Sequence, residues 1–350
     1  MKLTPSILLL ALGAVSVTAC SDDDNNGVSG DTDEITFNVT VPRAPRVATT
    51  TTNIKEFSTW AFTQDKLYMD NVVVRRDGSK WTYQPVMHWP VDDHAVNFFS
   101  VSPAIPATVS GFQNGRRHDM SGYVNTAGNV DLLYAVNMDE RSSKTKQVQV
   151  NFRHALSQVR VALRAQASTP AIRVEVNAVE LLNIYSRGDF DFPRKTTDRD
   201  DVSEATRGDW TDQSLPTDVT LYSGDGVDLS ETESTELNST GYYFALPQDL
   251  IDSKVNGATY TGAYARVRCQ IFDKKTDVKL WPSSTVSGYD SATQSAWLYF
   301  PLDTDSTRYD EWDLGKAYYY VLTVGMPSGS STISFDVTVD EYDMTQDKYN

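Results

Sequence analysis

The sequence predicts an all-β protein made of two tandem antiparallel β-sandwich domains. Three observations support this prediction. Segments with apolar residues at every second position recur along the chain, runs with helical spacing are scarce, and clusters of Gly, Pro, Asn and Asp separate the segments. Such alternation is typical of strands with one face on a core and one face in water, and many strands without intervening helices favour antiparallel sandwiches.

The alternating segments occur in both halves of the chain. They are residues 35–41, 148–152, 159–163, 172–176, 318–324 and 333–339. Each is long enough for one strand, and polar residues stand between its apolar ones. Helical spacing is limited to residues 246–251, where we expect one short helix.

The length of the chain predicts two domains. About 320 residues follow the polar N-terminal segment, which exceeds one ordinary core. A polar stretch at 139–146 precedes a new strand, so the predicted domains are residues 34–145 and 146–350. Residues 192–240 are rich in Asp, Thr, Ser and Glu, and we expect them to form long surface loops.

The chain begins with a secretory signal at residues 1–19. Lys2 precedes an apolar run of about 11 residues, which is too short for a membrane-spanning helix of about 20. The small residues before Cys20 resemble the lipobox of bacterial lipoproteins. This resemblance predicts that Cys20 is acylated and anchors the protein to a membrane. The alternative is an ordinary secreted protein in which the Cys stands there by chance.

Residues 20–33 are polar and predict a flexible acidic tether. The acidic run 22–24 resembles the surface-export tags of lipoproteins in some Gram-negative anaerobes, which implies a surface-exposed place on the outer membrane. A spacer facing the periplasm is the alternative.

The net charge of the whole chain is −16, and loss of Lys2 with the signal lowers it to −17. Because such a charge repels phosphates, nucleic acid is excluded as a partner.

No catalytic or metal-binding motif is recognisable, and we expect neither an enzyme nor a cofactor. The histidines lack metal-site spacing, and the phosphate-loop, dinucleotide and nucleophile-elbow signatures are missing. Asp92, Asp93 and His94 could bind a cation, although a solvated hairpin tip is the plainer interpretation. Paired glycosidase carboxylates meet only in the folded chain, so a glycan-degrading enzyme stays the weakest alternative.

The remaining notable side chains are expected to be structural. Cys269 shares a face with Val267 and Ile271, which predicts a buried thiol, and lipidation of Cys20 leaves it without a disulfide partner. Several tryptophans could stack on sugars, but they are more plainly core or edge residues of sandwiches. They are Trp60, Trp81, Trp89, Trp281 and Trp297.

Several stretches taken together resemble the fimbrillin family, the lipoprotein subunits of type V pili. In order along the chain they are Cys20 with strand 35–41, Trp81 with His88-Trp89-Pro90, Asn97–Pro103, Asp131–Ala135, Asn151–Val159, Val179–Asn183, Ser186–Phe190 and Phe244–Gln248. The resemblance covers nearly the whole mature chain. It departs at the tail, because many members end the last strand near a Trp and this chain has Glu341-Tyr342-Asp343.

The resemblance implies two transthyretin-like sandwiches and assembly with other pilus subunits into an adhesive surface fimbrium, as a homopolymer or a heteropolymer. It implies no active site and a structural role for His154. The place of the subunit in the fibre and its adhesion ligand stay open. The competing hypothesis is a monomeric surface lipoprotein that binds a glycan or a protein.

The first and last predicted strands share one pattern. Their apolar residues are Ile35, Phe37, Val39 and Val41 in the first, and Ile333, Phe335, Val337 and Val339 in the last. Two strands with the same inward side chains could fill the same groove. Coincidence is the alternative, because this pattern is common in strands.

The shared pattern suggests donor-strand exchange, in which a strand is added to an open sheet edge. Strand 35–41 would act as a placeholder, and the segment 331–344 of a neighbouring subunit would replace it. The Pro-containing connection after Val41 is expected to be exposed. Type V pilins are cut after an Arg in the corresponding loop, and we choose Arg46, with Arg43 as the alternative. A head-to-tail contact of this kind gives open fibres.

Overall fold

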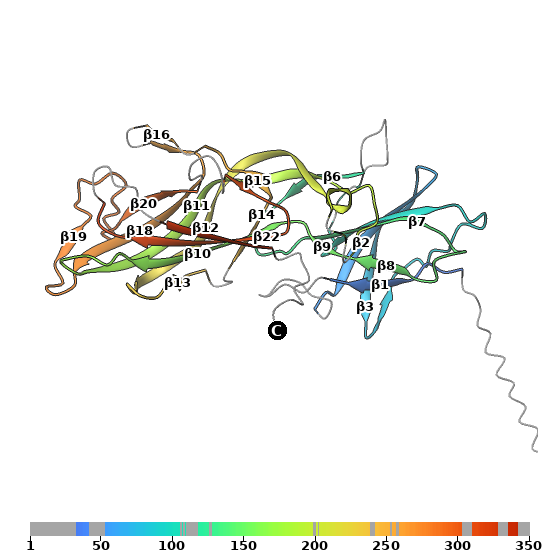
Figure 1. Cartoon of the computed structure of the whole chain (residues 1–350), viewed down its shortest axis with the longest axis horizontal. Helices are drawn as coiled ribbons and strands as arrows, with labels where there is room; N and C mark the ends of the chain where they lie inside the picture. Colours follow the sequence, from blue (N-terminus) through green and yellow to red (C-terminus); the bar gives the residue numbers. More distant parts are fainter. Residues whose placement is uncertain are drawn as a thin grey trace, which may run out of the picture. The chain divides into compact units, whose positions relative to one another are not determined.

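The computed structural model describes residues 33–41, 53–105, 107, 109, 118–125, 128–198, 201, 203–238, 242–252, 254–256, 259–302, 310–327 and 335–341. Within them every regular element is a strand, except the short 3₁₀ turn η1 (Glu204–Thr206). The all-β prediction is therefore confirmed. The strands form two sandwiches, one coloured mainly blue to cyan, with β8 and β9 in green, and one coloured mainly green to red (Figure 1). No helical segment in these ranges has the length and hydropathy of a membrane span.

The first sandwich consists of a six-stranded sheet and a two-stranded sheet. The six strands in spatial order are β4 (Lys80–Thr82), β3 (Lys66–Asp77), β2 (Glu56–Thr63), β5 (Val96–Ser102), β7 (Leu133–Glu140) and β9 (Arg153–His154). In the smaller sheet β1 (Phe37–Thr40) pairs in parallel with β8 (Val148–Asn151). Buried side chains of both sheets, including Phe37, Phe57 and Val148, form one core.

The second sandwich has two larger sheets around its own core. One contains β12 (Asp209–Asp228), β11 (Ile172–Asp191), β18 (Tyr264–Asp273) and β19 (Lys279–Trp281), with β20 (Ala296–Pro301) also paired to β18. The other contains β13 (Thr235–Glu236), β10 (Ser157–Ala165), β22 (Lys316–Val324) and β23 (Phe335–Glu341), with β14 (Tyr243–Ala245) also paired to β10. Alternate residues of β10, β11, β18 and β22 meet in the core between them.

The sheets are mainly antiparallel, with the parallel pairs β1–β8 and β10–β22 as exceptions. Two small antiparallel pairs complete the second half of the chain. They are β15 (Gln248–Asp249) with β21 (Glu311–Trp312), and β16 (Lys254–Asn256) with β17 (Thr259–Thr261).

Strand pairing crosses the predicted domain boundary at residues 145 and 146 in both directions. β8 and β9 follow the boundary but pair with β1 and β7. β6 (Asp119–Val124) precedes it but pairs with β11. A further cluster of buried side chains contains Trp60 and Phe99 from before the boundary and Phe190 and Phe244 from after it. The extents of the two domains therefore stay a prediction.

Two local expectations are wrong. Residues 246–251 form no helix, because the backbone of Gln248 and Asp249 pairs with Trp312 and Glu311 as a short strand. The Gln248 side chain also bonds the Tyr185 backbone: the Tyr185 N–H donates to Oε1 at 2.8 Å and Nε2 donates to the Tyr185 carbonyl at 3.2 Å. Residues 209–228, expected within a long loop, form strand β12. This strand has the composition of a loop because it lies at a sheet edge, where most of its side chains face water on both sides.

Candidate functional site

The candidate site is the groove of the first sandwich that holds the N-terminal strand. Ile35, Phe37, Val39 and Val41 are only 1%, 1%, 4% and 6% exposed. Their alternation puts all four on the face that meets the core, while Asn38 on the opposite face is exposed. The strand therefore completes the core of this sandwich rather than lying on its surface.

Phe37 lies at the centre of this contact. Its ring packs edge-on against Phe57 at 5.7 Å, Tyr83 at 5.6 Å and Phe98 at 5.8 Å between centroids. Edge-to-face pairs at such distances add roughly 0.5–1.5 kcal/mol beyond the area they bury. The three partners come from the six-stranded sheet and from the segment that follows β4, so Phe37 joins separate parts of the sandwich.

Backbone and polar side chains hold β1 against β8. The Val148 N–H donates to the Thr36 carbonyl at 2.8 Å, and the Phe152 N–H donates to the Thr40 carbonyl at 2.9 Å. On the solvent side the Asn38 amide donates to Gln149 Oε1 at 2.7 Å. This ladder is short, because the register covers only Phe37 to Thr40. Burial of the apolar side chains is the larger part of what retains the strand.

The segment after β4 closes the other side of β1, and sequence reasoning did not identify it. The Ile35 N–H donates to the Met87 carbonyl at 2.9 Å, and the Tyr83 hydroxyl donates to the Ile35 carbonyl at 2.7 Å. Burial, the largest cause, raises the pKa of Tyr83 to about 12, so the phenol stays neutral and keeps its proton to donate. No periodicity in this segment indicated its role.

The candidate donor strand lies in the second sandwich, where the backbone of β23 pairs with β22. Phe335 is opposite Leu322, Val337 is opposite Tyr320 and Val339 is opposite Tyr318, without a register shift. Ile333 lies outside the described residues, as do Cys20, Arg43 and Arg46. The predicted lipidation and cleavage sites therefore stay predictions.

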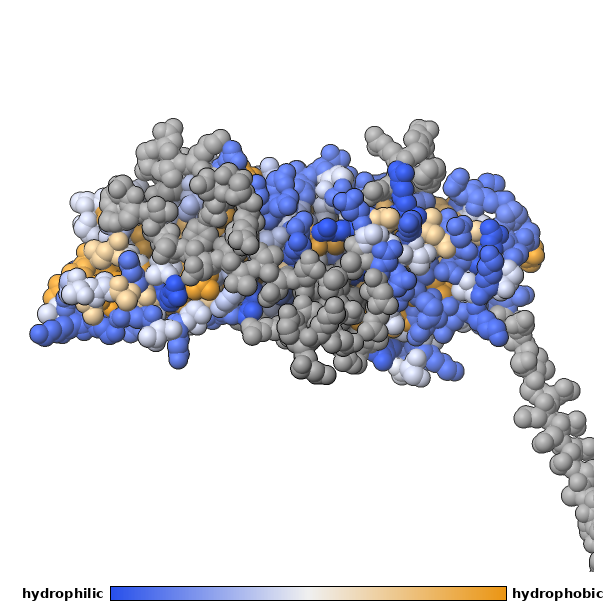
Figure 2. Space-filling view, viewed as in Figure 1, coloured by the Kyte–Doolittle hydropathy of each residue, from blue (hydrophilic) through white to orange (hydrophobic). Residues whose placement is uncertain are grey.

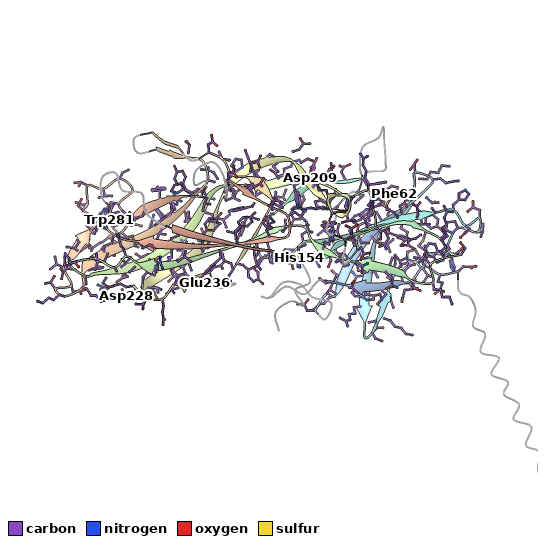
Figure 3. All side chains as sticks on the ribbon, in the orientation of Figure 1. Phe62, His154, Asp209, Asp228, Glu236 and Trp281 are labelled. Atoms are coloured by element: carbon purple, nitrogen blue, oxygen red, sulfur yellow. The ribbon has the colours of Figure 1, made fainter. Side chains whose placement is uncertain are left out.

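The four histidines are not gathered into one site. His154 is fully buried, and its Nδ1 is 2.8 Å from Asp131 Oδ1 (Figure 3 marks His154). His118 stacks on Phe99, with 4.1 Å between ring centroids. His94 contacts Asp92 on the surface, and no group of three or more metal-binding side chains occurs within the described ranges. His154 thus has the buried environment of a structural residue.

The acidic turn at residues 92–94 is tied to a neighbouring loop. The Ser142 and Ser143 hydroxyls donate to the Asp93 carboxylate at 3.0 and 2.6 Å. The bonds from Ser143 are the main cause that lowers the pKa of Asp93. Its carboxylate therefore joins the two loops as a hydrogen-bond acceptor.

The tryptophans and the remaining thiol are mostly core residues. Trp60, Trp89 and Trp281 are buried, and Trp81 packs on Phe57 at 5.4 Å. Trp297 is partly exposed but lies within cation–π distance of two guanidinium groups, Arg266 at 4.3 Å and Arg268 at 4.5 Å. Cys269 is fully buried, and burial raises the pKa of its thiol.

The described surface is largely hydrophilic, and its hydrophobic side chains show most clearly at the left end of Figure 2. The β18–β19 hairpin at that end carries the exposed residues Val278 and Leu280. The apolar side chains of β1, in contrast, are buried beneath the surface.

Several solved structures are similar to this chain. A fimbrial protein from Bacteroides vulgatus is 16% identical with a TM-score of 0.56, and the match covers 88% of this chain and 99% of that one. A cell adhesion protein, so described provisionally, from Bacteroides uniformis is 12% identical with a TM-score of 0.50, covering 89% and 99%. A fimbrilin (fimA) from Porphyromonas gingivalis is 9% identical with a TM-score of 0.48, covering 90% and 99%. At these identities the likeness to the first two structures shows the fold alone.

No curated protein matches the sequence. The sequence profile described as fimbrillin-like, however, matches residues 43–341, which is most of the chain. Together with the fold of the fimbrial proteins above, this supports a role as a pilus subunit or in adhesion at a surface fimbrium, assembled with other subunits, and it indicates a non-enzymatic protein. The chain belongs to the fimbrillin-like family.

Proposed function

We propose that this chain is a structural subunit of a surface pilus that is exported as a lipoprotein on Cys20 and polymerises by donor-strand exchange. In this mechanism β1 is a placeholder, cleavage after Arg46 releases it, and the segment 331–344 of a neighbouring subunit takes its place. The observation that supports it best is the burial of Ile35, Phe37, Val39 and Val41 in one core.

The sizes of the opposing effects favour an exchange over a simple loss of the strand. Complete burial of one large apolar side chain contributes about 1.5–3 kcal/mol, so the four together contribute about 6–12 kcal/mol. A subunit that lost this contribution would have little stability left, since whole domains are stable by about 5–15 kcal/mol. A replacing strand with the same apolar residues at the same spacing would restore most of it. The last strand of the chain has that sequence.

The donor strand must also leave its own sheet. β23 is held by seven residue pairs with β22, from Lys316 with Glu341 to Leu322 with Phe335. Those backbone bonds would be exchanged for bonds in the groove, so the net cost is small compared with the gain from burial. β23 lies at the end of its sheet, so its departure breaks pairing with only one strand.

The test is electron microscopy of the mature chain before and after treatment with an Arg-specific protease. We expect fibres only after cleavage, and mass spectrometry should locate the cut after Arg46. The matched variants Arg46→Ala and Arg43→Ala separate the two candidate positions, because only the variant at the true site should stay uncut and monomeric. Complete cleavage that leaves monomers would contradict the proposal and favour a monomeric binding protein.

A further inference from the structure

The longest exposed sheet edge in the second sandwich is β12. It contains 20 residues and pairs with β11 along one side, and none of the strands described here pairs with its other side. Figure 3 labels its two end residues, Asp209 and Asp228. An open edge of this kind presents unpaired N–H and C=O groups that can accept a strand from a second molecule.

The backbone of β12 is too irregular for continuous pairing. Its register with β11 shifts four times, near Val176, Val179, Leu181 and Arg187. Asp212 and Leu215 adopt left-handed conformations, with φ of 49° and 61°, which non-glycine residues rarely adopt. Pro216 follows directly and lacks an N–H to donate. An incoming strand would therefore meet interruptions in its ladder.

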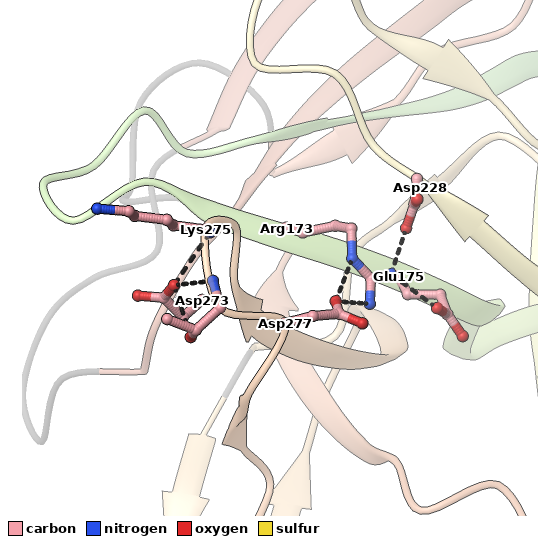
Figure 4. Close-up of polar contacts among 7 residues, drawn as sticks. Arg173, Glu175, Asp228, Asp273, Lys275 and Asp277 are labelled. Atoms are coloured by element: carbon pink, nitrogen blue, oxygen red, sulfur yellow. Dashed lines mark hydrogen bonds and ion pairs between the residues drawn. The ribbon is translucent and has the colours of Figure 1, made fainter.

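The negative charge of β12 also opposes pairing with a further strand. The strand carries five exposed aspartates and no Lys or Arg: Asp209, Asp212, Asp218, Asp225 and Asp228. Arg173 binds Asp228 at 2.9 Å but also binds Glu175 and Asp277, so its charge is shared (Figure 4). A second copy paired along this edge would bring two acidic strands together, and like charges across strands are destabilising.

β23, at the end of the other sheet of the second sandwich, is regular where β12 is irregular. Its seven residues pair with β22 in continuous register, and its sequence alternates regularly. The two strands thus differ in regularity although both end a sheet.

We propose that β12 is a sheet edge that blocks the addition of a further strand, so that copies of this chain do not associate side by side through it. This goes beyond the proposed function, because it concerns lateral contacts and not the joining of subunits along a fibre. The partner that is excluded is a second copy of this chain, or any extended strand.

The test removes two of the five charges of β12 and restores the N–H at residue 216 in the uncleaved mature chain, while the register shifts stay in place. The variant Asp212→Asn/Pro216→Val/Asp225→Asn loses two charges and restores one N–H. The control Asp65→Asn/Asp77→Asn loses two exposed charges in the first sandwich. By analytical ultracentrifugation we expect the wild type and the control to stay monomeric, while the variant shifts towards dimers and larger species as concentration rises.

Hydrogen exchange identifies the contact. In the associated variant the amides of residues 209–228 should become protected. A folded variant that stays monomeric, or one that associates with protection elsewhere, would overturn the proposal. If the triple variant does not fold, the double variant Asp212→Asn/Asp225→Asn decides in the same way. Because no cleavage is involved, the result is independent of whether the proposed polymerisation occurs.

Discussion

Phe37 and its neighbour Asn38 show how one strand presents two different faces. Phe37 is 1% exposed among three aromatic rings, whereas Asn38 is exposed and bonds Gln149. Most of the stabilisation of β1 in the groove therefore comes from its apolar face. At the scale of single residues, retention of β1 depends on packing more than on hydrogen bonding.

This contrast gives a prediction. Phe37→Ala should lower the free energy of unfolding by about 3–5 kcal/mol, because it removes a large buried side chain and leaves a cavity. Asn38→Ala, the matched control in the same strand, should cost less than about 1 kcal/mol, as surface changes usually do. Chemical denaturation of both variants measures the difference. Equal losses would show that β1 is held mainly by its backbone.

At the scale of elements, β1 and β23 are related by sequence but differ in their surroundings. β1 completes the core of the first sandwich, and the backbone of β23 pairs at the end of a sheet in the second. Such an end strand can leave with less disruption than a central one. The proposed exchange depends on this difference.

Placing charges on the apolar face of the last strand tests this role. Phe335→Asp/Val337→Asp should give a folded monomer that is cleaved but forms no fibres, because two carboxylates would enter an apolar groove at several kcal/mol each. The control Thr338→Asp puts a charge on the alternate face and should still polymerise. Circular dichroism and size-exclusion chromatography give the result. An unfolded double variant would make this strand indispensable to its own sandwich and would contradict donation.

At the scale of the whole molecule, described contacts join the two halves of the sequence. The rings of Phe99 and Phe192 pack at 5.3 Å. The indole N–H of Trp210 donates to the Ala155 carbonyl at 2.6 Å, and the Ala155 N–H donates in turn to the Leu132 carbonyl at 2.8 Å. β6 extends the sheet of the second sandwich although it precedes β7 of the first in sequence. The two sandwiches therefore share a cluster of buried side chains, and a strand from the first half of the sequence belongs to the second sandwich.

We accordingly expect residues 34–350 to unfold as one cooperative unit. Tryptophan fluorescence and far-ultraviolet circular dichroism should report the same denaturant midpoint, because neither sandwich keeps its shared core when the other unfolds. Trp210→Phe, which keeps a ring but loses the bond to Ala155, should lower that midpoint without separating the probes. Two distinct transitions in the wild type would show that the sandwiches are independent domains.

The sequence by itself determined which residues face inward wherever one face of a strand is buried and the other is exposed. In strands 35–41 and 172–176 strict alternation predicted the buried residues, because a strand turns successive side chains to opposite faces whatever its partner is. The same local rule predicted that Cys269 is buried between Val267 and Ile271, as the structure confirms. These features depend only on neighbours along the chain.

Only the tertiary structure decided which strands meet. Residues 148–151 read as a strand, but nothing local indicated that they pair with β1, more than 100 residues away. For β12 the sequence predicts a loop, because an edge strand whose two faces are both exposed to water lacks the alternation that marks other strands. Partner, register and edge position follow from the packing of distant segments, and the groove of β1 exists only after that packing is complete.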